Sequence, residues 1–305
     1  MASIRRGLKY LISNRTLFFD SIIRNFLGFL PDKLYLSLRY RCVMGNWINW
    51  KNPKTFSEKL QWLKIYDRKS TYTSKVDKYA VKQYVAEVIG EEYIIPTLGV
   101  WDRPEDIDWS ALPNQFVIKT THGGGGTGVL ICRDKQAFDV SDAIKKLNYS
   151  LSLDIYSSRR EWPYKDVPQR VIVEKYICPI ESTGLKDYKF FCFNGKVKFF
   201  KVDFGRFVEH HANYYSPQGH LLDFGELDYP PIPDASIELP TNLPVMIDLA
   251  EKLSKGFPFI RIDLYNNANK VYFGEMTFYP ASGMGKWTNS DADLQIGDYL
   301  SLPTL

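Results

Sequence analysis

The segment FVIKTTHGGGGTGVLIC, residues 116–132, decides how this chain folds. Its two ends, residues 116–120 and 129–132, are short apolar runs rich in β-branched side chains, which predicts two strands. The glycine run from Gly123 to Gly128 predicts a turn between them. A dinucleotide-binding loop would continue into a helix, and a Walker A loop would end in Gly-Lys-Ser/Thr; this segment does neither. We therefore expect a β-turn-β flap whose backbone N–H groups close over phosphates. A hairpin tip that binds nothing is the alternative.

Lys119 is the one charged residue in the first strand of this flap. An ammonium without a partner in an apolar strand would lower stability. A lysine placed directly before a phosphate-binding turn can instead bind phosphate oxygens. We therefore expect Lys119 to be functional.

Elsewhere the strands come in hairpins separated by helices. Asn194-Gly195 joins two apolar runs and is the strongest two-residue hairpin signal. The pattern predicts an α+β fold with antiparallel sheets rather than a doubly wound parallel sheet. Residues 1–68 are expected to be helical, and a second helix is expected to follow an N-cap at Ser74 and to end at Gly90. The expected elements are helices at about 75–89, 135–150 and 244–255, strands at 171–177, 188–193, 196–204, 259–265 and 271–276, and a loop at 157–166.

The hairpin formed by 259–265 and 271–276 carries two carboxylates, Asp263 and Glu275. A turn with an even number of residues would place them on opposite faces of the sheet. An odd turn, 266–270, would pair Arg261 with Glu275 and place Asp263 diagonally from Glu275 on the same face, where both could share magnesium. We expect the odd turn; a surface ion pair between Arg261 and Glu275 is the alternative.

Composition excludes several classes of protein. With 305 residues, 45% hydrophobic and 24% charged, the chain has enough apolar surface to fold and is not disordered. It has neither an apolar run of about 18 residues nor a secretion signal, so we expect a cytoplasmic protein. The four cysteines and four histidines lack zinc-site spacing, and no serine-triad motif is present.

Charge is unevenly distributed along the chain. Residues 1–68 carry 13 basic and four acidic side chains, although the net charge of the whole chain is only +4. This imbalance favours an anionic partner such as a polysaccharide, a membrane surface or a nucleic acid. A solvated basic face is the alternative.

About residues 75–285 resemble the ATP-grasp fold. The features that carry the resemblance are, in order, the lysine before a glycine flap, the Glu-x-x-Ile strand and the carboxylate hairpin. In that superfamily the nucleotide lies between two α+β halves. The resemblance implies four segments: a basic helical N-terminal segment (1–74), a preceding helix and strand (75–115), a small subdomain with the flap (116–178) and a large subdomain with the metal-binding hairpin (179–305).

The resemblance also implies roles for individual residues. ATP would be bound by Lys78 and Lys119, by the flap residues Gly123, Gly124, Gly125, Gly126 and Thr127, by the hinge residues Glu174, Lys175, Tyr176 and Ile177, and by Asp187 and Lys189. Magnesium would be bound by Asp263, Glu275 and Thr277, the last standing where the family usually has asparagine. Arg261 would act beside the transferred phosphoryl group.

More narrowly, five motifs in order resemble the TupA-like branch, named for teichuronopeptide biosynthesis. They are Asn52-Pro-Lys-Thr-Phe-Ser-Glu-Lys59-Leu-Gln-Trp-Leu, Asp77-Lys-Tyr, Lys119-Thr-Thr-His122-Gly, Asp187-Tyr-Lys-Phe-Phe-Cys-Phe-Asn-Gly195 and Glu275-Met-Thr-Phe-Tyr-Pro-Ala-Ser-Gly283. This resemblance implies bacterial surface-polysaccharide assembly, with an amide formed between an amine and a uronic-acid carboxylate.

The expected activity is therefore ATP-dependent carboxylate–amine ligation through an acyl phosphate, with ATP and Mg²⁺ as cofactors. Arg159 and Arg160 are candidates for holding the carboxylate substrate, together with Ser282 and Gly283. The expected partners are a uronic-acid-containing sugar or polysaccharide precursor, an amine or amino acid, and an anionic surface at the inner membrane, but no nucleic acid. A sugar kinase, a glycosyltransferase and a non-enzymatic sugar- or membrane-binding module are the alternatives.

Overall fold

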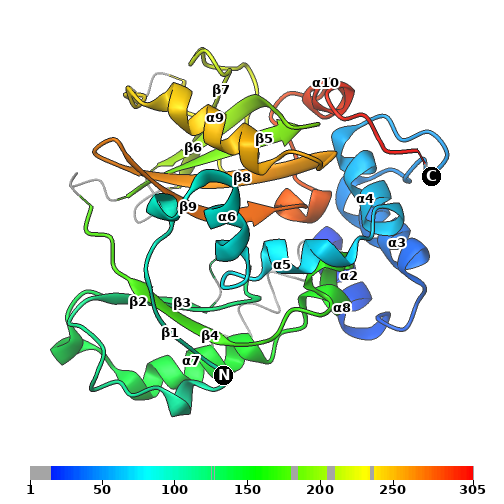
Figure 1. Ribbon diagram of the computed structural model, residues 1–305. Helices are drawn as coiled ribbons and strands as arrows, with labels where there is room; N and C mark the ends of the chain where they lie inside the picture. The colour runs from blue at the N-terminus through cyan, green and yellow to red at the C-terminus, as the bar shows by residue number, and fades with distance from the viewer. Residues whose placement is uncertain are drawn as a thin grey trace.

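Two antiparallel sheets form the framework of the chain, as the computed structural model shows (Figure 1). The structure describes residues 15–124, 126, 128–179, 185–204, 210–233 and 237–304. The smaller sheet has the strand order β1-β4-β2-β3 and the larger one β7-β6-β5-β8-β9. The strands are β1 (Thr97–Trp101), β2 (Phe116–Thr120), β3 (Val129–Cys132), β4 (Val171–Lys175), β5 (Lys186–Phe193), β6 (Lys196–Phe204), β7 (His211–Tyr215), β8 (Phe259–Asn267) and β9 (Lys270–Thr277).

The smaller sheet confirms the predicted flap. Strands β2 and β3 have the predicted bounds and pair antiparallel across the glycine run. Helix α7 (Val140–Leu151) packs its buried Leu147 into the core of this sheet, which also contains Ile118 and Val173. The predicted helix at 135–150 begins later than expected, because the side chain of Asp139 caps α7 by accepting a hydrogen bond from the backbone N–H of Asp142. Strand β1, which we had grouped with residues 75–115, pairs with β4 in this sheet.

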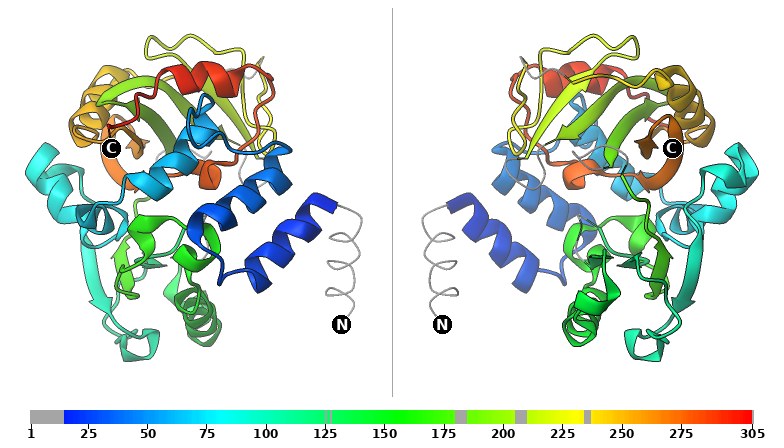
Figure 2. Two further views of the ribbon diagram at one scale, coloured as in Figure 1. Left: turned by 90° about the vertical axis from the view of Figure 1, so that its right-hand side faces the viewer. Right: turned by 90° about the vertical axis from the view of Figure 1, so that its left-hand side faces the viewer.

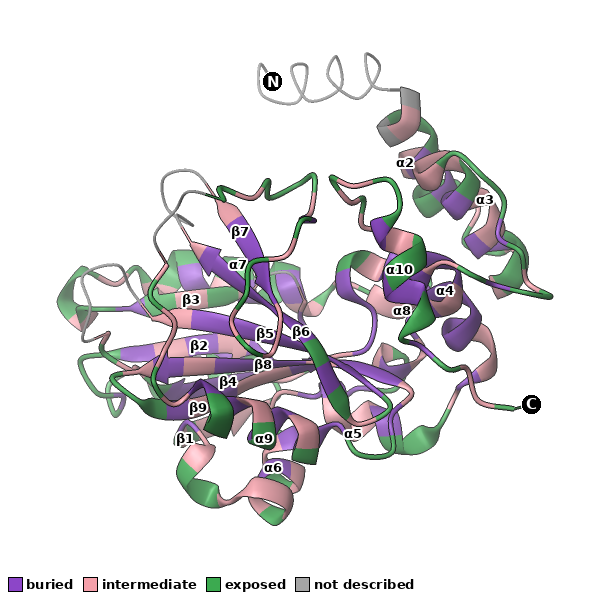
Figure 3. Cartoon of the chain, turned by 90° about the horizontal axis from the view of Figure 1, so that it is seen from above, coloured by how far each residue is buried: buried purple, intermediate pink, exposed green. Residues whose placement is uncertain are grey.

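The larger sheet is built on the two predicted hairpins. Asn194 and Gly195 both have positive φ, which the tight β5–β6 turn requires. Helix α9 (Leu243–Leu253) covers this sheet, and its buried face packs into a phenylalanine-rich core. Burial is concentrated in the strands, while helices expose their outer faces (Figure 3).

The β8–β9 hairpin corrects the predicted register. Its turn contains two residues, Ala268 and Asn269, so the expected odd turn is wrong. The register shifts between Asp263 and Leu264, where β9 has one extra residue, Gly274. This bulge brings Asp263 directly opposite Glu275. The two carboxylates are therefore neighbours because of a bulge inside the strand, which turn length alone could not predict.

The predicted helix at 75–89 is two helices, α5 (Thr73–Val76) and α6 (Val81–Ile89). Asp77 separates them, because its carboxylate accepts the backbone N–H groups of Tyr79 and Ala80 at 2.8 and 3.2 Å. Ser74 lies inside α5 and is not its N-cap. Gly90 ends α6, as predicted.

The predicted loop at 157–166 also contains regular structure. Helix α8 (Ile155–Arg159) is followed by the one-turn helix η5 (Trp162–Tyr164). Aromatic side chains that prefer packed surroundings account for this difference, since Tyr156 packs edge-on against Trp162.

Helices of the N-terminal segment lie beside the two sheets (Figure 2). They are α2 (Arg15–Phe26), α3 (Asp32–Met44) and α4 (Phe56–Tyr66). Helix α4 begins with a capping box of Thr55 and Glu58 and packs against α10 (Ala292–Asp298), where Asp293 accepts hydrogen bonds from Ser57. None of the helices in the described ranges has the length and apolar character needed to cross a membrane.

Candidate functional site

Glu174 on β4 lies at the centre of a buried charge cluster. Its carboxylate forms ion pairs with Lys119 on β2, at 2.5 Å, and with Lys82 on α6, at 2.6 Å. Burial alone would raise the pKa of Glu174, but the two ammonium groups hold it below its usual value. Burial lowers the pKa of Lys82, whereas Glu174 keeps that of Lys119 above its usual value. The cluster therefore stays charged and has a surplus of one positive charge.

Lys82 is a site residue that the sequence analysis missed. It also donates hydrogen bonds of 2.7 Å to the carbonyl of Ile95 and the hydroxyl of Thr97. Its position one helical turn after Lys78 was the available signal, because residues four apart in a helix share a face. The broken helix hid this relationship.

Lys78 joins the helical segment to the glycine flap. Its backbone N–H donates to the carbonyl of Thr121 at 3.0 Å, and its ammonium donates to the carbonyl of Gly123. The preceding Asp77 is buried and paired with Arg170 at 2.8 Å, which fixes the turn. Burial lowers the pKa of Lys78, and the negative charge of Glu275 acts against this shift. Lys78 therefore lies near both the flap and the larger sheet.

The flap itself needs glycine for conformational reasons. Gly126 and Gly128 have φ values of +78° and +76°. A Cβ on Gly128 would also lie 2.6 Å from that of Ser150, so only glycine fits there. Gly123 and Gly124 belong to the described residues, whereas Gly125 and Thr127 lie outside them.

The predicted hinge residues follow directly from β4. Lys175 ends this strand, and its backbone N–H donates to the carbonyl of Pro96 at 2.9 Å. Tyr176 and Ile177 come next and are half-buried. They lie on the chain segment that leads from the smaller sheet to β5 of the larger one.

Lys189 on β5 is surrounded by carboxylates of the larger sheet. Its ammonium contacts Asp187 on the same strand, Asp263 on β8 at 3.1 Å and Asp203 on β6 at 3.4 Å. Burial would lower the pKa of Lys189, but these carboxylates raise it well above the usual value. Lys189 is therefore a fixed cation next to the hairpin.

The carboxylate hairpin forms the other half of this cluster. The guanidinium of Arg261 binds both oxygens of Asp263, at 2.6 and 2.7 Å. It also donates to Glu275 and to the hydroxyl of Thr277, each at 3.1 Å. Burial and neighbouring carboxylates raise the pKa of Asp263 despite Arg261, whereas Lys78 and Arg261 keep the pKa of Glu275 low against the effect of burial.

The donor atoms of this hairpin suit a magnesium ion. Asp263, Glu275 and Thr277 offer only oxygen, and Mg²⁺ is usually held by one or two carboxylates together with phosphate oxygens. In the part of the chain that the structure describes, no group of three or more His, Cys, Asp or Glu side chains forms a ready metal cage. Any metal held here would thus need further oxygens from its ligand.

Lys201, Asp203 and Glu226 extend the network and were not anticipated. Lys201 pairs with Asp203 at 3.3 Å and with Glu226 at 2.8 Å, and His210 contacts Asp203 at 3.1 Å. The signal was present in β6, where Lys201 and Asp203 alternate with apolar residues of a buried strand. Charges inside such a strand require partners.

The predicted substrate residues fall into two groups. Arg160 is buried, pairs with Asp32 at 2.9 Å and lies over the ring of Tyr35, so its charge holds α8 against the N-terminal helices. Arg159 is exposed, and a Cβ on Gly124 would lie 3.9 Å from its Nη1 atom, which places its guanidinium beside the flap. Among the described residues, Arg159 has no ion-pair partner.

Lys64 on α4 connects the segments that carry these residues. Its buried ammonium donates to the carbonyl of Arg159 at 3.0 Å and to the carbonyl and hydroxyl of Ser282, both at 2.9 Å. Ser282 has a positive φ of 54°. Gly283 packs so closely on α4 that a Cβ would lie 2.9 Å from that of Leu60. Lys64 thereby fixes Arg159 and Ser282 relative to each other.

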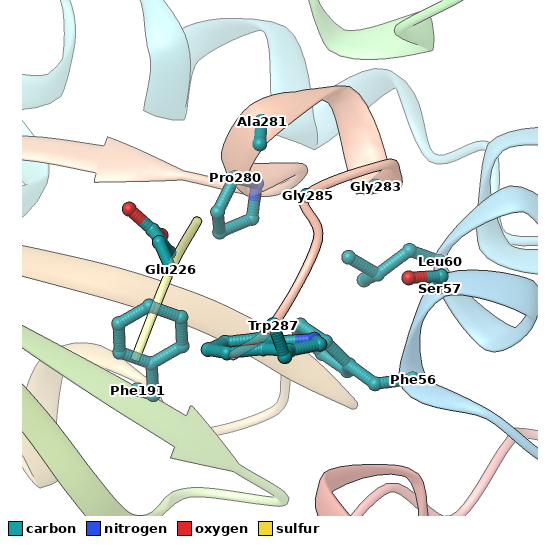
Figure 4. Close-up of a pocket in the computed structure, with 10 residues that line it drawn as sticks. All are labelled: Phe56, Ser57, Leu60, Phe191, Glu226, Pro280, Ala281, Gly283, Gly285 and Trp287. Carbon is teal, nitrogen blue, oxygen red and sulfur yellow. The ribbon is translucent and has the colours of Figure 1, made fainter. Parts of the chain in front are cut away.

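A void lined by Leu60 and Gly283 is too small to be the ligand site. It has a volume of about 10 Å³ and lies between α4 and the segment 280–287, with Phe56 and Trp287 among its walls (Figure 4). That volume holds one water molecule at most. The charged residues predicted for the site instead lie where the two sheets face each other.

Side chains from both sheets converge there. The charge of Glu275 on the larger sheet acts on Lys78 and Lys119, which belong to the other half. Four cations, Lys78, Lys119, Lys189 and Arg261, thus lie around the opposed carboxylates. Such an arrangement can bind a polyphosphate together with a divalent cation.

Comparison with known proteins identifies related chains. The model of the family described as TupA-like ATPgrasp matches residues 58–301. D-alanine–D-alanine ligase from Bacillus anthracis, complexed with ATP, aligns with 16% identity over 67% of this chain and 54% of its own, with a TM-score of 0.39. The corresponding ligase from Helicobacter pylori aligns with 18% identity over 81% and 69%, with a TM-score of 0.44. A D-cycloserine synthetase aligns with 16% identity over 74% and 69%, with a TM-score of 0.41. No curated protein matches.

Proposed function

Because the chain belongs to the TupA-like ATP-grasp family, we propose that it is an ATP-dependent carboxylate–amine ligase. ATP-grasp enzymes use ATP and Mg²⁺, and the mixed helix and strand architecture with two antiparallel sheets is theirs. In our proposal the carboxylate belongs to a uronic acid of a bacterial surface polysaccharide precursor, and the second substrate is an amine or amino acid. The chain spans 54% of the length of the Bacillus anthracis ligase.

The observation that carries this proposal is the placement of Arg261 between opposed carboxylates and near the ammonium groups of Lys78 and Lys189. Arg261 contacts Asp263, Glu275 and Thr277, and the charge of Lys78 reaches Glu275. These groups can stabilise charge that develops on a transferred phosphoryl group. No protein nucleophile is required for such a transfer.

In the proposed reaction, an oxygen of the acceptor carboxylate attacks the γ-phosphorus of ATP, and ADP leaves. The amine then attacks the carbonyl carbon of the acyl phosphate; phosphate leaves with that carboxylate oxygen, and the amine nitrogen loses a proton. Lys78, Lys119 and the flap N–H groups would neutralise the phosphates, while Arg159 would orient the acceptor carboxylate. Magnesium on Asp263 and Glu275 would supply charge stabilisation when bound.

The proposed acceptor is a polysaccharide precursor that is assembled at a membrane. We therefore propose that the protein contacts the inner membrane on its cytoplasmic side. Phe26 and Phe29, at and just after the end of α2, are 71% and 79% exposed, which supports an apolar contact there. The basic excess of residues 1–68 supports attraction to anionic lipid. Sedimentation with phosphatidylglycerol vesicles at low and high salt tests this contact; recovery of all protein in the supernatant at low salt would refute it.

Product analysis tests the proposed ligase activity. Purified protein would be incubated with ATP, Mg²⁺, a panel of uronic acids and a panel of amino acids. We expect ADP and free phosphate in equal amounts, only when both substrate classes are present. ADP formed without free phosphate, with phosphate retained on the sugar, would identify a kinase instead.

A further inference from the structure

A cavity of about 430 Å³ opens beside the glycine flap, between α8 and residues 164–169. Its volume is in the range of small-molecule sites. Its walls combine aromatic rings with hydrogen-bonding groups, from His122, Tyr156, Ser157, Tyr164, Asp166 and Gln169.

The wall chemistry suits a polyhydroxylated ring. Tyr156 and Tyr164 supply flat apolar faces, while Ser157, Asp166 and Gln169 supply donors and acceptors. Within the described ranges, Asp166 and Gln169 make no side-chain hydrogen bond with the protein, so both are available to a ligand. Both side chains are exposed, so sugar hydroxyl groups can reach them.

His122 closes the inner end of the cavity and is only 3% exposed. Neither ring nitrogen has a well-aligned hydrogen bond within the described residues, although carbonyls of Ser150 and Leu153 lie near the ring. Burial and the charge of Lys78 lower the pKa of His122, so its ring is neutral near pH 7. Both ring nitrogens are buried, so His122 closes the cavity as part of its wall and leaves recognition of hydroxyl groups to the other lining residues.

The cavity adjoins the site where phosphoryl transfer is proposed. His122 precedes Gly123, whose carbonyl accepts a hydrogen bond from Lys78. Tyr164, which lines the cavity, lies within electrostatic reach of Glu275 on the hairpin and of Arg159. A ring bound in the cavity would therefore lie near the residues proposed to bind and activate the carboxylate.

We propose that this cavity binds the sugar ring of the acceptor, with Asp166 and Gln169 contacting its hydroxyl groups. The inference deepens the proposed function and rests on it for the fate of the carboxylate. The ring itself, however, is recognised without its carboxylate, which makes binding testable apart from turnover.

Saturation-transfer NMR with methyl β-D-glucuronide and methyl β-D-glucoside tests this site in the presence of Mg²⁺ and a non-hydrolysable ATP analogue. Both sugars should receive saturation from the wild-type protein. Gln169→Trp fills the cavity and should weaken binding at least tenfold, and Asp166→Ala should weaken it less. Gln295→Trp, on the exposed face of α10, is the matched control and should bind normally.

Calorimetry with Mg²⁺–ATP checks that each variant keeps a folded nucleotide site. The proposal is overturned if the wild-type protein transfers no saturation at millimolar sugar, or if Gln169→Trp binds sugar normally. It is also overturned if the amino acid glycine, which has no sugar ring, displaces the sugar. If Gln169→Trp weakens sugar binding but no uronic acid stimulates ADP release, the proposed ligase activity is contradicted and the proposed sugar site stands. If uronic-acid-dependent ADP release is unchanged in Gln169→Trp, the proposed ligase activity stands and the proposed sugar site is contradicted.

Discussion

Asp263 on β8 lies directly opposite Glu275 on β9, because β9 contains one residue more than its partner at this point. The extra residue is Gly274, and a Cβ there would lie 2.9 Å from the carbonyl oxygen of Asp263. The bulge thus depends on glycine, and the opposed carboxylates depend on the bulge.

Gly274→Ala should therefore lower the free energy of unfolding by about 1–3 kcal/mol, because the new methyl group meets backbone that cannot move easily. Gly28→Ala is the control, since no atom lies within 4 Å of a Cβ at that position. It should change stability by less than about 0.5 kcal/mol. Urea unfolding measures both; equal stability of the two variants would show that the bulge tolerates a side chain.

The local parts of the fold could be predicted from sequence, and the bulge shows where prediction fails. Strands β2 and β3 follow from β-branched runs around glycines, and the β5–β6 turn follows from Asn194-Gly195. The β8–β9 register could not be derived from turn length, because Gly274 shifts it inside the strand. The break before α6 depends on Asp77 bonding to nearby backbone, which competes with a helical pattern that looks continuous.

Only part of the candidate site could be predicted from the sequence, because Lys82, Lys201 and Asp203 were not anticipated. Lys119 stood out as a charge in an apolar strand, whereas Glu174 followed from the family resemblance. Their contact requires β2 and β4 to be neighbours. Lys82 reaches Glu174 only through tertiary packing of α6. Long-range pairing of this kind leaves no local pattern in the sequence.

The effects of removing Lys82 and of removing Lys119 on the free energy of unfolding should be strongly coupled. Each lysine still neutralises Glu174 when the other is removed. Lys82→Met with Lys119→Met would leave a buried carboxylate unpaired, which typically costs about 3–5 kcal/mol. We expect the double variant to lose more stability than the two single variants added together. Simple additivity in urea unfolding would contradict shared pairing.

ATP affinity should depend on Lys119. Calorimetry with Mg²⁺–ATP should give at least tenfold weaker binding for Lys119→Met, because its ammonium precedes the flap. Lys196→Met, which removes an exposed ion pair with Glu251, is the control and should bind normally. Absence of binding heat for the wild-type protein well above micromolar concentration would refute the nucleotide site.

Glu275→Gln should keep the fold but lower turnover by roughly 10²-fold or more, the scale of losing a key electrostatic stabiliser. The amide keeps the shape of the side chain but removes its charge. Glu251→Gln is the matched control, because it removes the charge from a surface pair with Lys196 and keeps an acceptor for the backbone N–H of Val197. Turnover close to that of the wild-type protein would place the magnesium ion elsewhere.

Lys64 should make stability depend on pH. Burial lowers its pKa to about 7 from 10.5, although Glu161 acts in the opposite direction. Between these pH values the unfolded chain holds a proton that the folded chain lacks, so stability should rise with pH, by at most about 1.4 kcal/mol per unit from this group. Lys64→Met should remove this part of the slope in urea unfolding between pH 7 and 9. An identical slope in both proteins would show that Lys64 does not titrate there.

The most direct test of the ligase proposal is to trap the activated carboxylate. Hydroxylamine would replace the amine in a reaction that contains ATP, Mg²⁺ and a uronic acid that supports turnover. The account predicts a hydroxamate of the sugar, formed in equal amounts with ADP and free phosphate and absent without the uronic acid. A phosphorylated sugar that is stable to hydroxylamine, formed with ADP but without free phosphate, would contradict it.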